Sequence, residues 1–146
     1  CQEELDVILQ LKTAEEVYSN PKAPYWAYWY ATNVIQGRWS EAEGVIRKSP
    51  EWAYWYTIDI IQARWIEAEE VIRESPMWAY RYARDVVKAR WIEGEEAIKG
   101  SPMWAYMYAK SVIKGRWIEG EEAIKTNRHY SSLYKAHFNI KEMWYL

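Results

Sequence analysis

A repeat of 26 residues constrains this chain more than any other feature. Four prolines at this spacing each open a segment that reads Pro-x-Trp-Ala-Tyr-x-Tyr and continues to an Arg-Trp pair. Tandem self-similarity at such a period is typical of solenoids, in which each copy buries its apolar face against the next copy. We therefore divide the chain into an N-terminal cap (1–23), four repeats (24–49, 50–75, 76–101 and 102–127) and a C-terminal cap (128–146).

Each repeat is expected to form two short helices. Ser-Pro pairs place serine at the N-cap and proline at the first helical position, where the missing N–H costs nothing. The second helix is expected to follow the Arg-Trp pair, and in the first repeat Ser40 and Glu43 have capping-box spacing. No alternating strand pattern occurs, so we predict an all-α, TPR-like, right-handed α-solenoid with half-repeat caps. The first helices are predicted to end at Gly37, Ala63, Ala89 and Gly115.

The core must be built largely from rings with polar tips, because the chain has 11 Trp and 13 Tyr but one Phe. On a helical wheel, Trp65, Ala68 and Ile72 form one packed stripe of the second helix. Small residues repeated four apart on the first helix allow a neighbouring helix to approach closely. The rings predicted to lie in the core are Trp39, Trp65, Trp91 and Trp117 with Tyr30, Tyr56, Tyr82 and Tyr108.

The second helix of each repeat carries several carboxylates, and the first of them lies three residues after the arginine of the Arg-Trp pair. A row of carboxylates is one way to bind divalent cations. Arginine at this spacing favours ion pairs instead, and Glu69 and its equivalents are placed to accept from buried Tyr or Trp donors. We therefore predict a structural network and no metal site.

Signals for catalysis are weak. The chain has neither a phosphate-cradling glycine loop nor a nucleophile elbow. His129 and His137 fit no metal-binding pattern and are interpreted as cap residues, and the single cysteine, Cys1, forms no internal disulfide framework. No apolar run approaches the roughly 18 residues that a membrane-spanning helix needs. We predict a protein that is not an enzyme and has no cofactor.

The first helices differ between repeats mainly on the side opposite the packed one. Exposed apolar residues gathered in one patch usually mark a binding site, whereas a solvated surface without a partner is the plainer alternative. Along the chain this surface changes from aromatic to basic. The predicted partner-binding residues are Tyr25, Trp29, Trp55, Ile58, Arg81, Arg84, Lys88, Lys110 and Lys114.

The repeat pattern resembles a tandem-repeat family of tailed-bacteriophage proteins. The residues that carry the resemblance are Ala27-Tyr28-Trp29-Tyr30-Ala31, Val34-Ile35 and Gly37-Arg38-Trp39-Ser40-Glu41-Ala42-Glu43, and it extends over 24–127. Family members often have proline after the tryptophan, where this chain has Ser40, Ile66, Ile92 and Ile118. The resemblance implies a phage or prophage origin, and hence the cytoplasm of an infected bacterial cell, but no chemistry.

Together these patterns predict a non-catalytic scaffold that binds a protein partner. In the setting that the resemblance implies, the partner is a host or defence protein that the scaffold binds or blocks. Two alternatives stay open. One is nucleic-acid or nucleotide binding through the aromatic and basic surface, and the other is self-assembly into oligomers or filaments through the ends of the solenoid.

Overall fold

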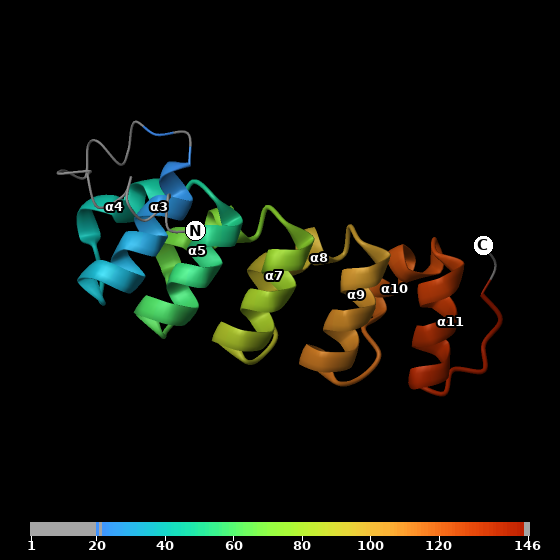
Figure 1. Ribbon diagram of the computed structural model, residues 1–146. Coiled ribbons are helices and arrows are strands. Elements are labelled where there is room, and N and C mark those ends of the chain that lie inside the picture. Colours follow the sequence, from blue (N-terminus) through green and yellow to red (C-terminus); the bar gives the residue numbers. More distant parts are fainter. Residues whose placement is uncertain (1–19, 21, 145–146) are drawn as a thin grey trace. The chain divides into compact units, whose positions relative to one another are not determined.

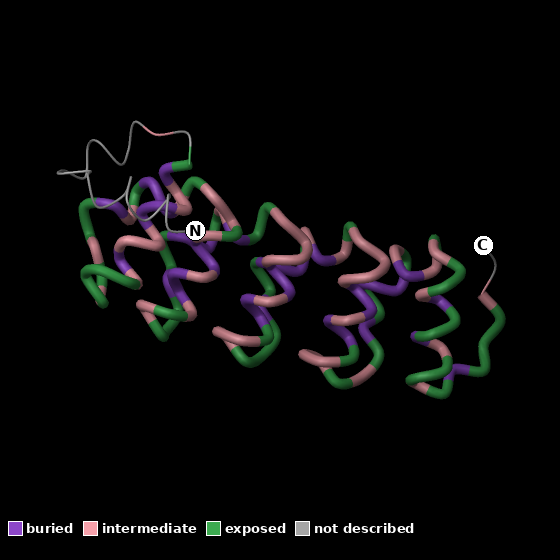
Figure 2. The backbone as a smooth tube through the Cα atoms, in the orientation of Figure 1, coloured by how far each residue is buried: buried purple, intermediate pink, exposed green. Residues whose placement is uncertain are grey.

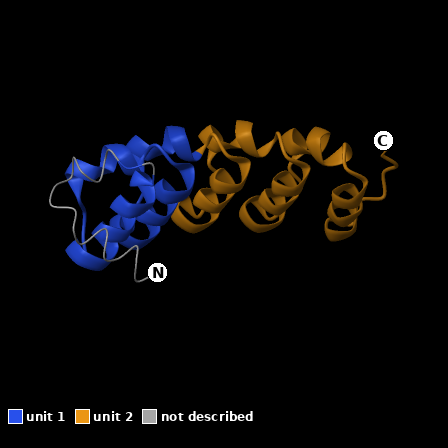
Figure 3. Ribbon diagram, turned by 45° about the horizontal axis from the view of Figure 1, so that its top comes forward, with its two compact units in different colours: residues 1–72 blue, residues 73–146 orange. Residues whose placement is uncertain are grey.

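The computed structural model describes residue 20 and residues 22–144, and all the regular structure in them is helical (Figure 1). This confirms the all-α class. The predicted N-terminal cap lies almost entirely outside the described residues. The chain divides into two compact units, residues 1–72 and residues 73–146 (Figure 3), which are described separately below.

In unit 1, two first helices pack against each other and against their second helices. Each first helix continues into a wider π-helical turn, labelled η. The helix α3 contacts α4 and α5, and α5 contacts α4 and α6. The elements are α3 (Ala23–Tyr30), η1 (Ala31–Ile35), α4 (Ser40–Ile46), α5 (Pro50–Tyr56), η2 (Thr57–Ile61) and α6 (Ile66–Ile72).

In unit 2, three helices lie side by side in the order α7, α9, α11 (Figure 1). The second helix α8 packs against α7 and α9, and α10 packs against α9 and α11. The elements are α7 (Pro76–Tyr82), η3 (Ala83–Val87), α8 (Ile92–Ile98), α9 (Pro102–Tyr108), η4 (Ala109–Ile113), α10 (Ile118–Lys125) and α11 (Arg128–His137).

Serine and proline start the first helices as predicted. The side chains of Ser49, Ser75 and Ser101 accept from the backbone N–H three residues later, at 3.3, 3.5 and 3.4 Å. The capping box predicted at Ser40 is wrong. Ser40 is the first residue of α4 and Trp39 is its N-cap, because the Glu43 carboxylate that would complete the box binds Arg38 and Tyr56 instead.

The first helices end two residues before the predicted positions, since η2, for example, ends at Ile61. The residue after each π turn has left-handed backbone, and its N–H closes the turn; the N–H of Gln62, for example, donates to the carbonyl of Thr57 at 2.7 Å. Among the described glycines none has a positive φ. Each π turn begins with a buried residue and is otherwise half-buried or exposed (Figure 2). The left-handed residues are Gln36, Gln62, Lys88 and Lys114, with φ between 57° and 59°.

The predicted core is confirmed in both units. Trp65, Ala68 and Ile72 are buried, whereas Tyr30 and Trp39 are half-buried. The other rings predicted to lie in the core are also buried, namely Tyr56, Tyr82, Trp91, Tyr108 and Trp117. Within each repeat the tyrosine ring packs on the tryptophan of the same repeat, with centroids 4.8–5.1 Å apart. Small residues repeated four apart, such as Ala105 and Ala109, are fully buried and allow close helix packing.

In unit 1 a tyrosine hydroxyl joins the second repeat to the first. The Tyr56 hydroxyl donates to Glu43 Oε1 at 3.0 Å and accepts from the backbone N–H of Trp39 at 2.8 Å. Arg38 binds both oxygens of Glu43 at 2.8 Å. We call this set of contacts the tyrosine interlock. It confirms that the second-helix carboxylates form a structural network with arginine and tyrosine.

The tyrosine interlock recurs twice in unit 2 with the same spacing, 13 residues from glutamate to tyrosine and 17 from tryptophan to tyrosine. The Tyr108 hydroxyl donates to Glu95 at 2.8 Å and accepts from Trp91 N–H at 2.9 Å. The Tyr134 hydroxyl donates to Glu121 at 2.9 Å and accepts from Trp117 N–H at 2.8 Å. Burial is the main cause that raises the pKa of Tyr56 and of Tyr134 to about 12, so these hydroxyls stay protonated donors.

Burial alone would raise the pKa of Glu43. The hydrogen bonds from Arg38 and Tyr56 outweigh that effect and leave the pKa of Glu43 below its usual value. The carboxylate is therefore charged at neutral pH and accepts from both donors.

The C-terminal cap completes the last interlock. Tyr134 lies on α11, and the chain beyond α11 returns so that Glu142 binds Arg116 Nη1 at 2.9 Å. The Trp144 ring packs on Tyr134 with centroids 5.6 Å apart. Trp144 thus has the role that Trp117 has toward Tyr108, but its tyrosine lies ten residues away in sequence instead of nine.

Two tryptophans of the second repeat test the assignment of packed and outer positions. Trp65→Ala empties a site that is 2 % exposed, so the free energy of unfolding should fall by about 3–5 kcal/mol. Trp55→Ala alters a half-buried ring and should cost clearly less. Urea melts followed by circular dichroism measure both changes, and equal losses would contradict the assignment.

Tyr108→Phe tests the tyrosine interlock. The variant keeps the ring but leaves Glu95 and the Trp91 N–H without the hydroxyl, so stability should fall by about 1–3 kcal/mol. Tyr106→Phe is the control, since it removes a hydroxyl from another buried tyrosine of the same helix. A loss at Tyr108 no greater than at Tyr106 would show that the interlock contributes little stability.

Candidate partner-binding surface

The outer residues predicted in unit 1 lie on neighbouring helices. Tyr25 and Trp29 are on α3, Trp55 is on α5 and Ile58 is on η2, and all four are half-buried. The Trp55 ring packs edge-on against Tyr54, with centroids 5.0 Å apart. Because α3 contacts α5 and η1 contacts η2, these side chains belong to one row of first helices.

A second tryptophan column, not singled out from the sequence, also contributes to this row. Trp52 packs against both Tyr25 and Tyr28 of the preceding repeat, with centroids 4.8 and 5.2 Å apart. Trp104 packs in the same way on Tyr80, at 5.4 Å. The sequence signal was present, since tryptophan occupies the third position of every repeat. Tyr25 is therefore partly used in packing between repeats.

Three of the five basic residues predicted in unit 2 lie over aromatic rings. Arg81 lies over the Trp78 ring at 4.9 Å and Arg84 over the Tyr80 ring at 5.2 Å, and Lys110 lies 5.9 Å from the Tyr106 centroid. Such cation–π contacts orient the cations and occupy the ring faces.

Arg84 is the most constrained of these cations. It binds both carboxylate oxygens of Asp85, at 2.7 and 2.8 Å, and its Nη1 lies 3.5 Å from the Tyr80 hydroxyl. The hydrogen bonds to Asp85 hold the pKa of Arg84 above its usual range. The guanidinium is therefore both charged and fixed in direction.

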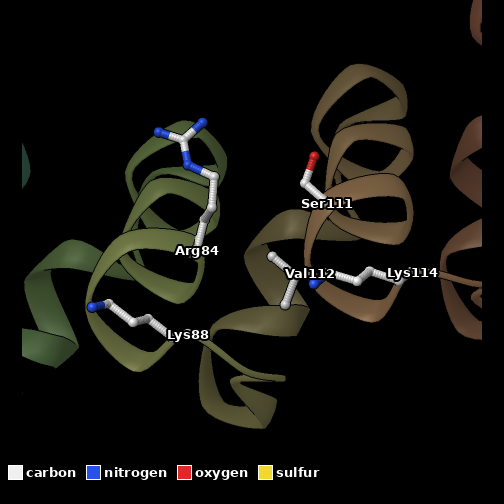
Figure 4. Close-up of a pocket in the computed structure, with 5 residues that line it drawn as sticks. All are labelled: Arg84, Lys88, Ser111, Val112 and Lys114. Carbon is white, nitrogen blue, oxygen red and sulfur yellow. The ribbon is translucent and has the colours of Figure 1, made fainter.

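A pocket of about 180 Å³ lies between η3 and η4 (Figure 4). Two of its lining residues, Lys88 and Lys114, are the left-handed residues that end the π turns. In unit 1 the equivalent left-handed residues are the neutral Gln36 and Gln62. Non-glycine residues in this conformation are strained, and such strain gathers at functional sites. The pocket is lined by Arg84, Lys88, Ser111, Val112 and Lys114.

The position of Ser111 differs in character from repeat to repeat. Its equivalents are Asn33 and Asp59 in unit 1 and Asp85 in unit 2. The Asp59 Oδ2 accepts a 2.6 Å hydrogen bond from the Tyr28 hydroxyl, and burial, followed by this hydrogen bond, raises the pKa of Tyr28 to about 12. Asp85 binds Arg84, and Ser111 is a neutral hydroxyl at the pocket.

Charge separates the first helices of the two units. The segments 76–88 and 102–114 of unit 2 hold five cations and one carboxylate, a net charge of +4. The equivalent segments of unit 1, 24–36 and 50–62, hold two carboxylates and no cation. The predicted aromatic and basic residues thus fall in different units, and a continuous surface across both stays a prediction.

Comparison of the chain with protein-family models, with curated proteins and with solved structures found no match. Within residue 20 and residues 22–144, no cluster of His, Cys, Asp and Glu suits a metal ion. No helix in the same part of the chain has the length and apolar character needed to cross a membrane.

Lys88→Gly tests the strain beside the pocket. Lysine pays about 1–2 kcal/mol for left-handed backbone, which glycine adopts freely. After the entropy cost of glycine, the free energy of unfolding should rise by up to about 1 kcal/mol. Lys110→Gly is the control, because Lys110 lies inside η4 without a positive φ and glycine there should cost about 1 kcal/mol. Equal destabilisation of the two variants in urea melts would show that the backbone at Lys88 is not strained.

Proposed function

We propose that this protein is a non-catalytic repeat scaffold that binds a protein partner through the outer positions of its first helices. One observation carries the proposal. The tyrosines, tryptophans and glutamates that the repeats share make internal contacts, the tyrosine interlock above all, whereas most positions of the first helices that differ between repeats lie half-buried or exposed. Varying side chains gathered on one surface of a repeat scaffold favour partner recognition.

The architecture proposed for this scaffold is a right-handed α-solenoid of four repeats with half-repeat caps. The tyrosine interlock supports it, since the same contacts with the same sequence spacing recur in both units. Stacking of identical contacts builds an extended surface on which neighbouring repeats present equivalent side chains side by side.

The proposed setting is the cytoplasm of a bacterium infected by a phage, where the scaffold binds or blocks a host or defence protein. Support for the setting is the repeat pattern of residues 24–127 and its resemblance to repeats of tailed-bacteriophage proteins.

Nucleic acid is the less favoured partner. Bases stack on open aromatic faces, but in unit 2 the rings nearest the cations are already covered by Arg81, Arg84 and Lys110. The whole chain also carries a net charge of −2, which opposes general attraction of a polyanion.

The proposal is tested by capture followed by measured binding. Partners captured from a bacterial lysate by the full chain are identified by mass spectrometry, purified, and titrated calorimetrically. The double change Trp29→Ala with Trp55→Ala removes two large rings of the outer surface. It should weaken binding by at least about 30-fold, or about 2 kcal/mol, while the circular dichroism spectrum is retained.

The matched control is Ile66→Ala with Ile92→Ala. Both isoleucines are 62 % exposed but start second helices, so the control removes apolar surface from a different part of each repeat and should leave binding unchanged. Binding that survives the tryptophan changes, or that is lost in the isoleucine control, would overturn the proposed surface. A captured nucleic acid whose binding falls steeply with salt would favour the alternative.

A further inference from the structure

The pocket between η3 and η4 combines uncompensated positive charge with a hydroxyl donor. Among the described residues, neither Lys88 nor Lys114 forms an ion pair, and both are exposed. Ser111 and Val112 of η4 also line the pocket. The pocket therefore suits a group that carries negative charge and accepts hydrogen bonds.

The charged ends around the pocket point in different directions. In Figure 4 the Arg84 guanidinium, the Lys88 amine and the Lys114 amine diverge instead of converging on one point. One small anion cannot contact all three cations at once. Several carboxylates spaced along an extended chain can do so, because each meets its own cation.

We infer that unit 2 binds an extended acidic segment of a protein partner, with one carboxylate side chain at the pocket and its neighbours on the surrounding cations. The inference rests on the proposed function and gives the chemistry of the partner. A net charge of +4 on the two first-helix segments is complementary to such a segment. The equivalent part of unit 1, with Glu51 and Asp59 and no cation, is not.

The second helices of unit 2 give the acidic segment a direction of approach. With the arginines that pair with them, residues 90–99 and 116–125 hold six carboxylates and four cations, a net charge of −2. An acidic chain is repelled from these helices and attracted to the first helices, so charge steers it to one side of the unit. The same charges oppose a long polyanion that would wrap the unit.

Arg84 and the two lysines should contribute differently. Arg84 is already bound to Asp85 and held over Tyr80, so its charge is partly neutralised and its side chain loses little freedom on binding. Lys88 and Lys114 form no ion pair with any described residue. We therefore expect the two lysines to dominate the affinity for the acidic segment.

The test uses the full chain and a short fluorescein-labelled peptide of alternating glutamate and serine, followed by fluorescence anisotropy. The double change Lys88→Gln with Lys114→Gln should weaken peptide binding by at least about tenfold, and added salt should weaken binding to the unchanged chain. Glutamine is a safe replacement, since Gln36 and Gln62 occupy the same left-handed position in unit 1.

The matched control is Lys99→Gln with Lys125→Gln, which removes the same charge from the second helices. These lysines contact Glu96 and Glu122 at 2.7 and 3.6 Å, and the control should change peptide affinity by less than about twofold. Equal losses in the two double variants would show that only overall charge matters and would overturn the site.

Two competitor molecules distinguish an acidic peptide from other anionic ligands. Inorganic phosphate that displaces the peptide at equal molar concentration would make the pocket a site for a single anion, and an oligothymidylate of equal charge that binds more tightly than the peptide would indicate nucleic acid. Either result overturns the inference.

Binding assays with the captured partner distinguish a failure of this inference from a failure of the proposed function. If that partner needs Trp29 and Trp55 but is indifferent to Lys88 and Lys114, the acidic-segment inference fails and the scaffold function stands. If the peptide needs the two lysines but no captured protein depends on either pair, the basic site stands and the proposed function fails.

Discussion

The structure depends on a tyrosine that serves two repeats at once. The ring of Tyr108 packs on Trp117 of its own repeat, while its hydroxyl donates to Glu95 and accepts from the Trp91 N–H of the repeat before it. Phenylalanine or leucine would bury similar surface but could satisfy neither group. The unusual abundance of tyrosine and tryptophan therefore follows from the way in which repeats are joined, because a buried carboxylate and a backbone donor both need a polar partner.

Sequence reasoning was most reliable for the packing features that all the repeats share. The positions of Trp65, Ala68 and Ile72, the serine caps and the arginine–glutamate network all follow from periodicity and from the need to pair buried charge. The ends of the first helices did not follow. A π turn places Gln62 or Lys88 in the left-handed conformation, and a helical wheel with a fixed period has no signal for such a change of period. Trp144 was missed for a related reason, since its extra residue shifts it out of the repeat register.

In the candidate surface, too, some features could be predicted from the sequence and others could not. Inspection of the differences between repeats identified the outer residues and their change from aromatic to basic, because variation and charge are visible in sequence. Two kinds of contact limit those residues: Trp52 packs on Tyr25, and cations lie over the rings of Trp78, Tyr80 and Tyr106. The first contact depends on which helices are neighbours in space, whereas each cation lies three or four residues after its ring on the same helix, a spacing that the sequence displays. They turn an apparent set of open stacking rings into a surface whose accessible chemistry in unit 2 is mainly cationic.

The tyrosine interlock also gives the array a chemical polarity. Each glutamate requires a hydroxyl that arrives from the next repeat, so the last full repeat always presents a buried carboxylate to whatever follows it. Here Tyr134 of α11 supplies that hydroxyl, and Glu142 binds Arg116. The C-terminal cap can therefore pack on any preceding repeat that has the same glutamate and arginine. Duplication or loss of a whole 26-residue segment would keep the 13- and 17-residue spacings of the described interlocks, so the number of repeats before α11 can change while the contacts of α11 stay the same.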